Sequence, residues 1–96
     1  MRKITIESIE AFLKGYDYKS SNTTVIGKAG ATYLKLHGNT IACKLNDGTI
    51  EVTIAGWNTN VTRERLNGIP GVSISTCKGQ AFLNGNPIED DKFYVI

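Results

Sequence analysis

The sequence predicts an α+β fold, in which an antiparallel sheet of about five to six strands carries an N-terminal helix on one face. Three observations support this prediction. Apolar residues near the N-terminus recur at helical spacing, and from Thr23 onward they alternate with polar residues at a period of two. A short second helix, with its own start and stop signals, separates two groups of strands. The 96 residues are expected to form a single domain, 1–96.

The first helix is predicted from an apolar stripe made of Ile6, Ile9, Phe12 and Leu13. Such residues return to one face of a helix every three or four positions. Thr5 is the expected N-cap residue, because its hydroxyl can accept a hydrogen bond from a free backbone amide. Gly15 is expected to end the helix, since glycine readily adopts the left-handed conformation found there.

Alternating segments predict the strands, which cover residues 23–28, 31–37, 40–45, 49–55, 71–76, 80–83 and 92–96. Short runs rich in Gly, Asn and Asp separate most of them and predict tight turns. The clearest alternation places Ile50, Val52 and Ile54 on one face and polar residues on the other. This pattern is typical of an antiparallel sheet with one face in water.

The helical and strand periods agree on one shared interior. In the segment 40–45, alternation predicts that Ile41, Cys43 and Leu45 face inward together. The predicted core contains Ile9, Phe12, Leu34, Leu36, Ile41, Ile50, Val52, Ile54, Leu66, Val72 and Ile74. Truncating such residues creates cavities, so helix and sheet should depend on each other for stability.

The segment "AGWNTNVTRERLNGIPG" at 55–71 predicts the second helix. Asn58, Thr59 and Asn60 are all competent N-cap residues, so the helix should start near Val61. Glycine and proline at 68 and 70 stop it, and Leu66 anchors it to the core.

Two interpretations of this segment compete. In the structural one, Trp57 packs on the edge of the core, and Arg63 and Arg65 are exposed charges with little effect on stability. In the functional one, Trp57 stacks on a nucleic-acid base while the two arginines hold phosphates. Glu64 offsets one of the arginine charges, which favours the structural interpretation.

Composition and charge argue against several classes of protein. The net charge of +2 is smaller than a dedicated DNA-binding domain of this size usually carries. No apolar run approaches the roughly 18 residues that span a membrane, and Glu7 and Glu10 interrupt any signal-peptide core. We therefore expect a cytoplasmic protein.

Cys43 and Cys77 are expected to be reduced thiols without zinc, because their spacing is not that of metal ligands. No cofactor is indicated.

No catalytic constellation is visible. His37 lies alone in "LHGN", with no predicted base partner or nucleophile beside it. Glu89, Asp90 and Asp91 lack the spacing of a calcium loop and are expected to form a solvated turn. Neither a phosphate-binding loop nor a nucleophile elbow occurs. The sequence therefore predicts that the protein is not an enzyme.

The stretches "SNTTV", "LKLHGNTIA", "AGWNTNVTRERLNGIPGVSI" and the later "LNG" resemble a family of small uncharacterised proteins from tailed bacteriophages. The resemblance covers most of residues 5–85, and its matching positions are 36–39, Gly56, Trp57, Thr62 and 64–68. The chain departs from the family pattern after Lys78 and in its C-terminal tail. The resemblance implies a phage or phage-like source, and hence the host cytoplasm, without implying an activity.

Two functions remain open. The first is a small non-enzymatic protein-interaction module that binds a host or phage protein, or a second copy through free strand edges. The alternative is a nucleic-acid-binding module that uses the outer sheet face, with Tyr33, Lys35, Lys44 and Trp57 as candidates. The combined candidate binding surface comprises Tyr33, Lys35, His37, Lys44, Trp57, Arg63 and Arg65.

Overall fold

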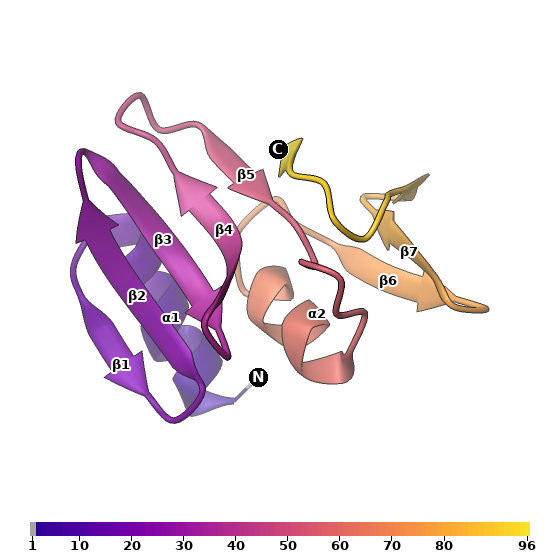
Figure 1. The fold of residues 1–96 in the computed structure, drawn as a ribbon, viewed down its shortest axis with the longest axis horizontal. Coiled ribbons are helices and arrows are strands. Elements are labelled where there is room, and N and C mark those ends of the chain that lie inside the picture. Colours follow the sequence, from indigo (N-terminus) through magenta and orange to yellow (C-terminus); the bar gives the residue numbers. More distant parts are fainter. Residues whose placement is uncertain (1) are drawn as a thin grey trace.

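The computed structural model describes residues 2–96 and contains two helices and two antiparallel sheets (Figure 1). In chain order the elements are α1 (Lys3–Lys14), β1 (Tyr18–Ser20), β2 (Thr23–Lys28), β3 (Ala31–Leu36), β4 (Asn39–Lys44), β5 (Ile50–Val52), α2 (Asn60–Asn67), β6 (Ile74–Cys77), β7 (Gln80–Leu83), β8 (Asn86–Pro87) and β9 (Tyr94–Val95). The predicted α+β class is confirmed. Neither helix is long and apolar enough to cross a membrane.

The larger sheet has six strands in the order β1-β2-β3-β4-β5-β9, and the smaller has three in the order β6-β7-β8. The first five strands follow the chain from neighbour to neighbour, as tight turns dictate. Only the last strand, β9, returns to the larger sheet, where Tyr94 pairs with Val52. The separate smaller sheet was not predicted, and neither were β1 and β8, which are too short to show alternation.

Helix α1 covers one face of the larger sheet, as predicted, and lies behind β2 and β3 in Figure 1. Its start was predicted wrongly. Arg2 occupies the N-cap position, and Thr5 lies inside the helix with a buried side chain. Gly15 ends the helix as expected, with a φ of 84° and its amide donating to the Ala11 carbonyl at 2.8 Å. Ile6 faces solvent and does not join the apolar stripe.

A β-bulge between β3 and β4 changes which residues of β4 face inward. Lys35 pairs with Thr40, but the next pair is Leu34 with Ala42, so Ile41 is an extra residue. Beyond the bulge the alternation is shifted by one position.

The shift overturns part of the predicted alternation in the segment 40–45. Cys43 pairs with Tyr33 on the outer face, and Leu45 is exposed. Lys44 instead pairs with Thr32 on the helix-covered face, where its ammonium group donates to the Leu13 carbonyl near the end of α1. A lysine at a helix C-terminus is favoured by the helix dipole.

One hydrophobic cluster joins α1, α2 and both sheets. The predicted core residues are buried with the exception of Ile50, which is half-buried and packs against the cluster. The residues added by the second half of the chain include Ile69, Ala81, Leu83 and Ile88. Helix α2 and the smaller sheet therefore extend the same interior that α1 covers.

Candidate functional site

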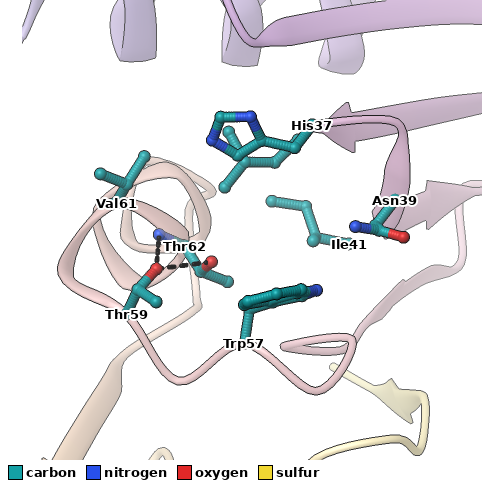
Figure 2. Close-up of a pocket in the computed structure, with 8 residues that line it drawn as sticks. His37, Asn39, Ile41, Trp57, Thr59, Val61 and Thr62 are labelled. Carbon is teal, nitrogen blue, oxygen red and sulfur yellow. Dashed lines mark hydrogen bonds between the residues drawn. The ribbon is translucent and has the colours of Figure 1, made fainter.

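A pocket of about 450 Å³ opens between the β3–β4 turn, the segment after β5 and the start of α2 (Figure 2). Its lining residues are Leu36, His37, Asn39, Ile41, Trp57, Thr59, Val61 and Thr62. The volume lies within the range of about 300–1,000 Å³ that is typical of ligand sites. The wall is mainly apolar, with a few polar groups at its edge.

The β3–β4 turn places His37 at this pocket. His37 and Gly38 have φ values of 52° and 81°, and they connect the paired residues Leu36 and Asn39. Two successive left-handed residues form the tight turn that matches the twist of a hairpin. The imidazole therefore projects from the turn itself, and its Nε2 lies 3.4 Å from the Asn22 amide nitrogen.

A second left-handed turn places Trp57. Ala55 and Gly56 have φ values of 53° and 82°, and the Trp57 amide donates to the Ile54 carbonyl at 2.8 Å. The Gly56 amide donates to the Asp90 carbonyl at 2.7 Å, which ties this turn to the C-terminal segment. The backbone that carries the indole is thus fixed on both sides.

Helix α2 supplies the third wall. Thr59 is its N-cap residue, and its hydroxyl oxygen accepts a hydrogen bond from the Thr62 amide at 3.2 Å. The two hydroxyl groups also lie 3.0 Å apart (Figure 2). Of the three predicted caps, Thr59 therefore performs the role. Asn58 and Asn60 instead accept hydrogen bonds from the Arg63 guanidinium.

Trp57 is 59% exposed, so the prediction that it packs on the edge of the core is wrong. In Figure 2 Ile41 lies beside the ring, and His37 lies on the opposite side of the pocket. Ile41 and Leu36, which lie in the pocket wall, are themselves buried core residues. A large aromatic surface therefore stands exposed next to an apolar wall that is already formed.

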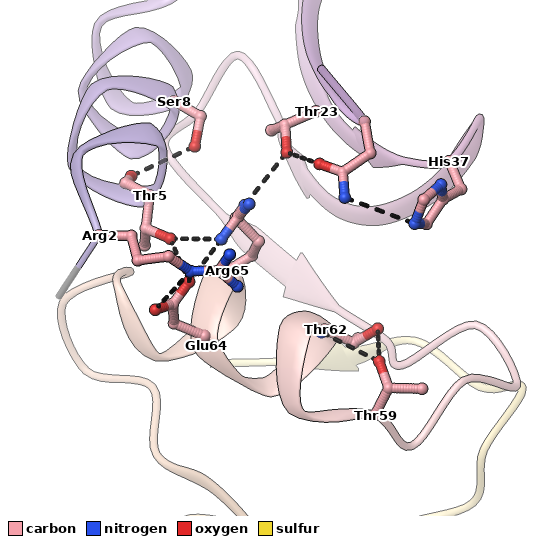
Figure 3. A network of polar contacts seen from close by, with 10 residues as sticks. Arg2, Thr5, Ser8, Thr23, His37, Thr59, Thr62, Glu64 and Arg65 are labelled. Atoms are coloured by element: carbon pink, nitrogen blue, oxygen red, sulfur yellow. Dashed lines mark hydrogen bonds and ion pairs between the residues drawn. The ribbon is translucent and has the colours of Figure 1, made fainter. Parts of the chain in front are cut away.

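Arg65 has the opposite environment: its side chain is only 1% exposed. Figure 3 shows it among Thr5, Thr23 and Glu64. Its Nε donates to the Thr23 hydroxyl at 3.1 Å, and one terminal nitrogen donates to the Thr5 hydroxyl at 2.6 Å. The same nitrogen forms an ion pair of 2.5 Å with Glu64. The prediction that Arg65 is an exposed charge is therefore wrong, because this side chain joins α1, α2 and β2 from within.

Glu64 is shared between Arg65 and the N-terminus of α1. It accepts hydrogen bonds from the Thr5 hydroxyl at 2.8 Å and from the Arg2 Nε at 3.0 Å. Partial burial opposes ionisation of its carboxyl group. The hydrogen bonds from Thr5 and Arg2, together with the charges of Arg2 and Arg65, outweigh that effect and hold the pKa below its ordinary value. The carboxylate therefore remains charged when the network is intact.

The predicted binding residues lie in several places. His37 and Trp57 both line the pocket, whereas Arg63 of α2 does not line it and donates to Asn58 and Asn60. Tyr33 and Lys35 lie on the outer sheet face. The two remaining residues, Lys44 and Arg65, make contacts on the inner side of the sheet and do not contribute to an open surface.

A known protein family matches almost the whole chain. The family described as Kyanoviridae Gp96 protein matches residues 1–95. The chain belongs to this family. The match confirms the resemblance to small phage proteins and extends it beyond residue 85 through the C-terminal tail. No curated protein and no solved structure matches this Gp96-family chain.

Within residues 2–96, no three side chains of His, Cys, Asp or Glu converge as metal ligands. Cys43 and Cys77 are both free thiols, the first buried and the second exposed. Burial, followed by the charge of Glu51, raises the pKa of the Cys43 thiol, so this thiol is a weak nucleophile.

Sequence reasoning found His37 and Trp57 but missed the rest of the pocket. Leu36 and Ile41 were assigned to the core, which is correct, but their contribution to an open wall was not visible. The available signal was the pair of left-handed turns in "LHGN" and "AGW". The first turn leads directly into β4 and the second leads toward α2, and sequence alone does not place them side by side.

Proposed function

We propose that this Gp96-family protein is a small non-enzymatic protein-interaction module in the cytoplasm of the host cell. Its Trp57 pocket binds an apolar side chain of a host or phage protein. The observation that carries this proposal is the 59% exposure of Trp57 beside a wall formed by buried Leu36 and Ile41. Tryptophan is among the residues that most often dominate the energy of protein interfaces.

The physical basis is the apolar surface that a partner would remove from water. Tryptophan side chains can bury about 150–250 Å² and can still use the indole N–H as a donor at the edge of a contact. The pocket wall is rigid, because Leu36 and Ile41 belong to the hydrophobic core and Thr59 caps α2. Little ordering would therefore oppose binding, since a pre-formed site loses little conformational entropy.

The polar groups at the pocket favour binding over catalysis. His37 contacts the Asn22 amide at 3.4 Å, and an amide does not activate an imidazole as a carboxylate does. The hydroxyl groups of Thr59 and Thr62 face each other. This arrangement offers hydrogen-bonding groups that could orient a partner, with no activated nucleophile.

The test is affinity capture from infected host cells, in which nuclease treatment separates direct protein contacts from those bridged by nucleic acid. We expect a partner that wild-type protein retains after nuclease treatment and that Trp57→Ala loses. Tyr16→Ala is the matched control. Tyr16 is also an exposed aromatic residue, but it lies just after the end of α1 and does not line the pocket. A partner retained equally by Trp57→Ala, or no retained partner at all, would contradict the proposal.

Intrinsic fluorescence gives a second measurement with the purified partner. Trp57 is the only tryptophan in the chain, so its emission reports on this pocket alone. Binding in the pocket should shift the emission to shorter wavelength, because the indole leaves water. A partner that contains no tryptophan and binds without changing this emission occupies another surface, and that result would overturn the proposed site.

A further inference from the structure

The outer face of the larger sheet carries lysines on either side of an aromatic row. Lys19 of β1 and Lys35 of β3 share one cross-strand row, because both pair with Thr24 of β2. The next row contains the pair Ile26 and Tyr33. Successive residues on one face of a strand are about 7 Å apart, so Lys28 extends this face one row further.

This face is open to solvent. Helix α1 lies behind β2 and β3 in Figure 1, so the view is onto the uncovered side of the sheet. A shallow hollow of about 490 Å³ lies here, and its lining includes Ile26, Lys28, Tyr33 and Lys35. Across residues 2–96, the ion pairs involve other cations and leave Lys19, Lys28 and Lys35 unpaired.

We propose that this face binds single-stranded nucleic acid. The lysines hold backbone phosphates, and an unstacked base lies on the ring of Tyr33 beside Ile26. Sheet faces that recognise single strands combine these two features, since every base offers a π-face to an aromatic side chain. A flat sheet face presents no helix to enter the major groove of a duplex. The proposal goes beyond the proposed function, because it uses a surface separate from the Trp57 pocket.

Acidic groups define the edges of this surface. Glu51 of β5 pairs with Cys43 on the outer face, and Cys43 pairs with Tyr33, so Glu51 lies two strands beyond the tyrosine. Its carboxylate would repel phosphates from the β5 side. Asp17, next to β1, accepts a hydrogen bond from the Gly27 amide at 3.0 Å. The favourable path for a polyanion therefore lies between Glu51 and Asp17, over β2 and β3 and the Lys19 end of β1.

The experiment measures the anisotropy of a fluorescent oligothymidylate of about ten nucleotides, which fits known sheet-face sites. The titrations use the full chain at salt concentrations from about 50 to 200 mM. Three phosphate contacts predict a slope of log K against log salt of about −2 for a single strand. A duplex of the same length should bind more weakly. No binding at the lowest salt, or tighter binding of the duplex, overturns the proposal.

The matched variants remove equal charge from different surfaces. Lys19→Ala, Lys28→Ala and Lys35→Ala together should weaken binding at least about tenfold at the lowest salt and flatten the slope. The control combines Lys3→Ala, Lys14→Ala and Lys92→Ala, whose lysines form ion pairs away from this face, and should change binding little. Equal losses in both triple variants would show attraction by net charge alone and overturn the site.

Tyr33→Leu tests the base contact, because leucine keeps an apolar strand residue but removes the ring. We expect about a fivefold or greater loss of affinity with an unchanged salt slope. Trp57→Ala should bind the oligonucleotide as wild type does, which separates this site from the pocket. If Tyr33→Leu has no effect and polyglutamate binds as well as the oligonucleotide, the face binds acidic protein and the proposal is wrong.

Discussion

Trp57 and Arg65, eight positions apart in one segment, occupy environments opposite to their chemistry. The tryptophan, the largest apolar side chain, is 59% exposed, whereas the arginine is 1% exposed. Each position has a different physical explanation. The arginine is surrounded by acceptors in Thr5, Thr23 and Glu64, which compensate for the water it loses. The indole, by contrast, keeps most of its surface in contact with water.

The contrast separates residues that maintain the fold from residues available to a partner. Arg65 connects α2 to α1 and β2 by hydrogen bonds, so it stabilises the fold. Because it is buried, it is not available to a partner. Trp57 is held on a fixed turn next to an apolar pocket, with more than half of its surface exposed. Exposed apolar surface beside a pocket is typical of an interaction site. The predictions below challenge this division.

The largest effect is expected from Arg65→Ala. The change leaves the partly buried Glu64 with Arg2 as its remaining ion-pair partner, and it removes a donor from the hydroxyls of Thr5 and Thr23. Breaking a buried ion pair by removing one partner costs about 3–5 kcal/mol. Equilibrium unfolding in denaturant should show this loss. Arg63→Ala is the control and should cost below about 1 kcal/mol, because Arg63 is only half-buried and its partners Asn58 and Asn60 are neutral. If the two substitutions lower the free energy of unfolding equally, the structural role assigned to Arg65 is wrong.

Trp57→Ala should show the reverse combination. Because most of the indole is already in water, the free energy of unfolding should change by less than about 1 kcal/mol. Capture of the protein partner should nevertheless be lost. Denaturant unfolding and affinity capture on the same preparation check both halves. A loss of several kcal/mol would show that the ring supports the core after all, and the pocket would then lose its main argument.

The Glu64 network predicts a pH dependence of stability. The folded-state pKa of Glu64 lies below its unfolded value, so its ionised form stabilises the fold above the unfolded pKa. That contribution decreases as the pH falls through the folded pKa. The difference in unfolding free energy between wild type and Glu64→Gln should therefore shrink from about pH 6 to about pH 3. A constant difference over this range would mean that the carboxylate charge does not stabilise the network.

Sequence patterns predicted the parts of the fold that follow local rules. Alternation and turn residues located most strands and identified the core residues of α1 and the first sheet. The β4 bulge could not be predicted, because one extra residue at Ile41 depends on how β3 and β4 pair. It moved Lys44 from the expected outer face to the end of α1. The exposure of Trp57 and the burial of Arg65 were also missed, because both depend on contacts between segments distant in sequence.

The smallest expected effects come from the left-handed turns at opposite ends of β3. Ala29 and His37 have the same φ of 52°, and each precedes a glycine in a hairpin. Asparagine tolerates this conformation better than alanine, and Asn-Gly is a favoured hairpin pair. Ala29→Asn should therefore stabilise the protein by about 0.5 kcal/mol without affecting partner binding.

His37→Asn provides the matched change at the pocket. The turn should remain equally stable, since asparagine also accepts a positive φ. Partner binding should weaken, however, because the imidazole that faces Trp57 across the pocket is removed (Figure 2). Thermal unfolding and the Trp57 emission titration measure the two effects on each variant. If Ala29→Asn and His37→Asn give the same result in both measurements, His37 serves only the turn. The binding site would then be limited to the tryptophan side of the pocket.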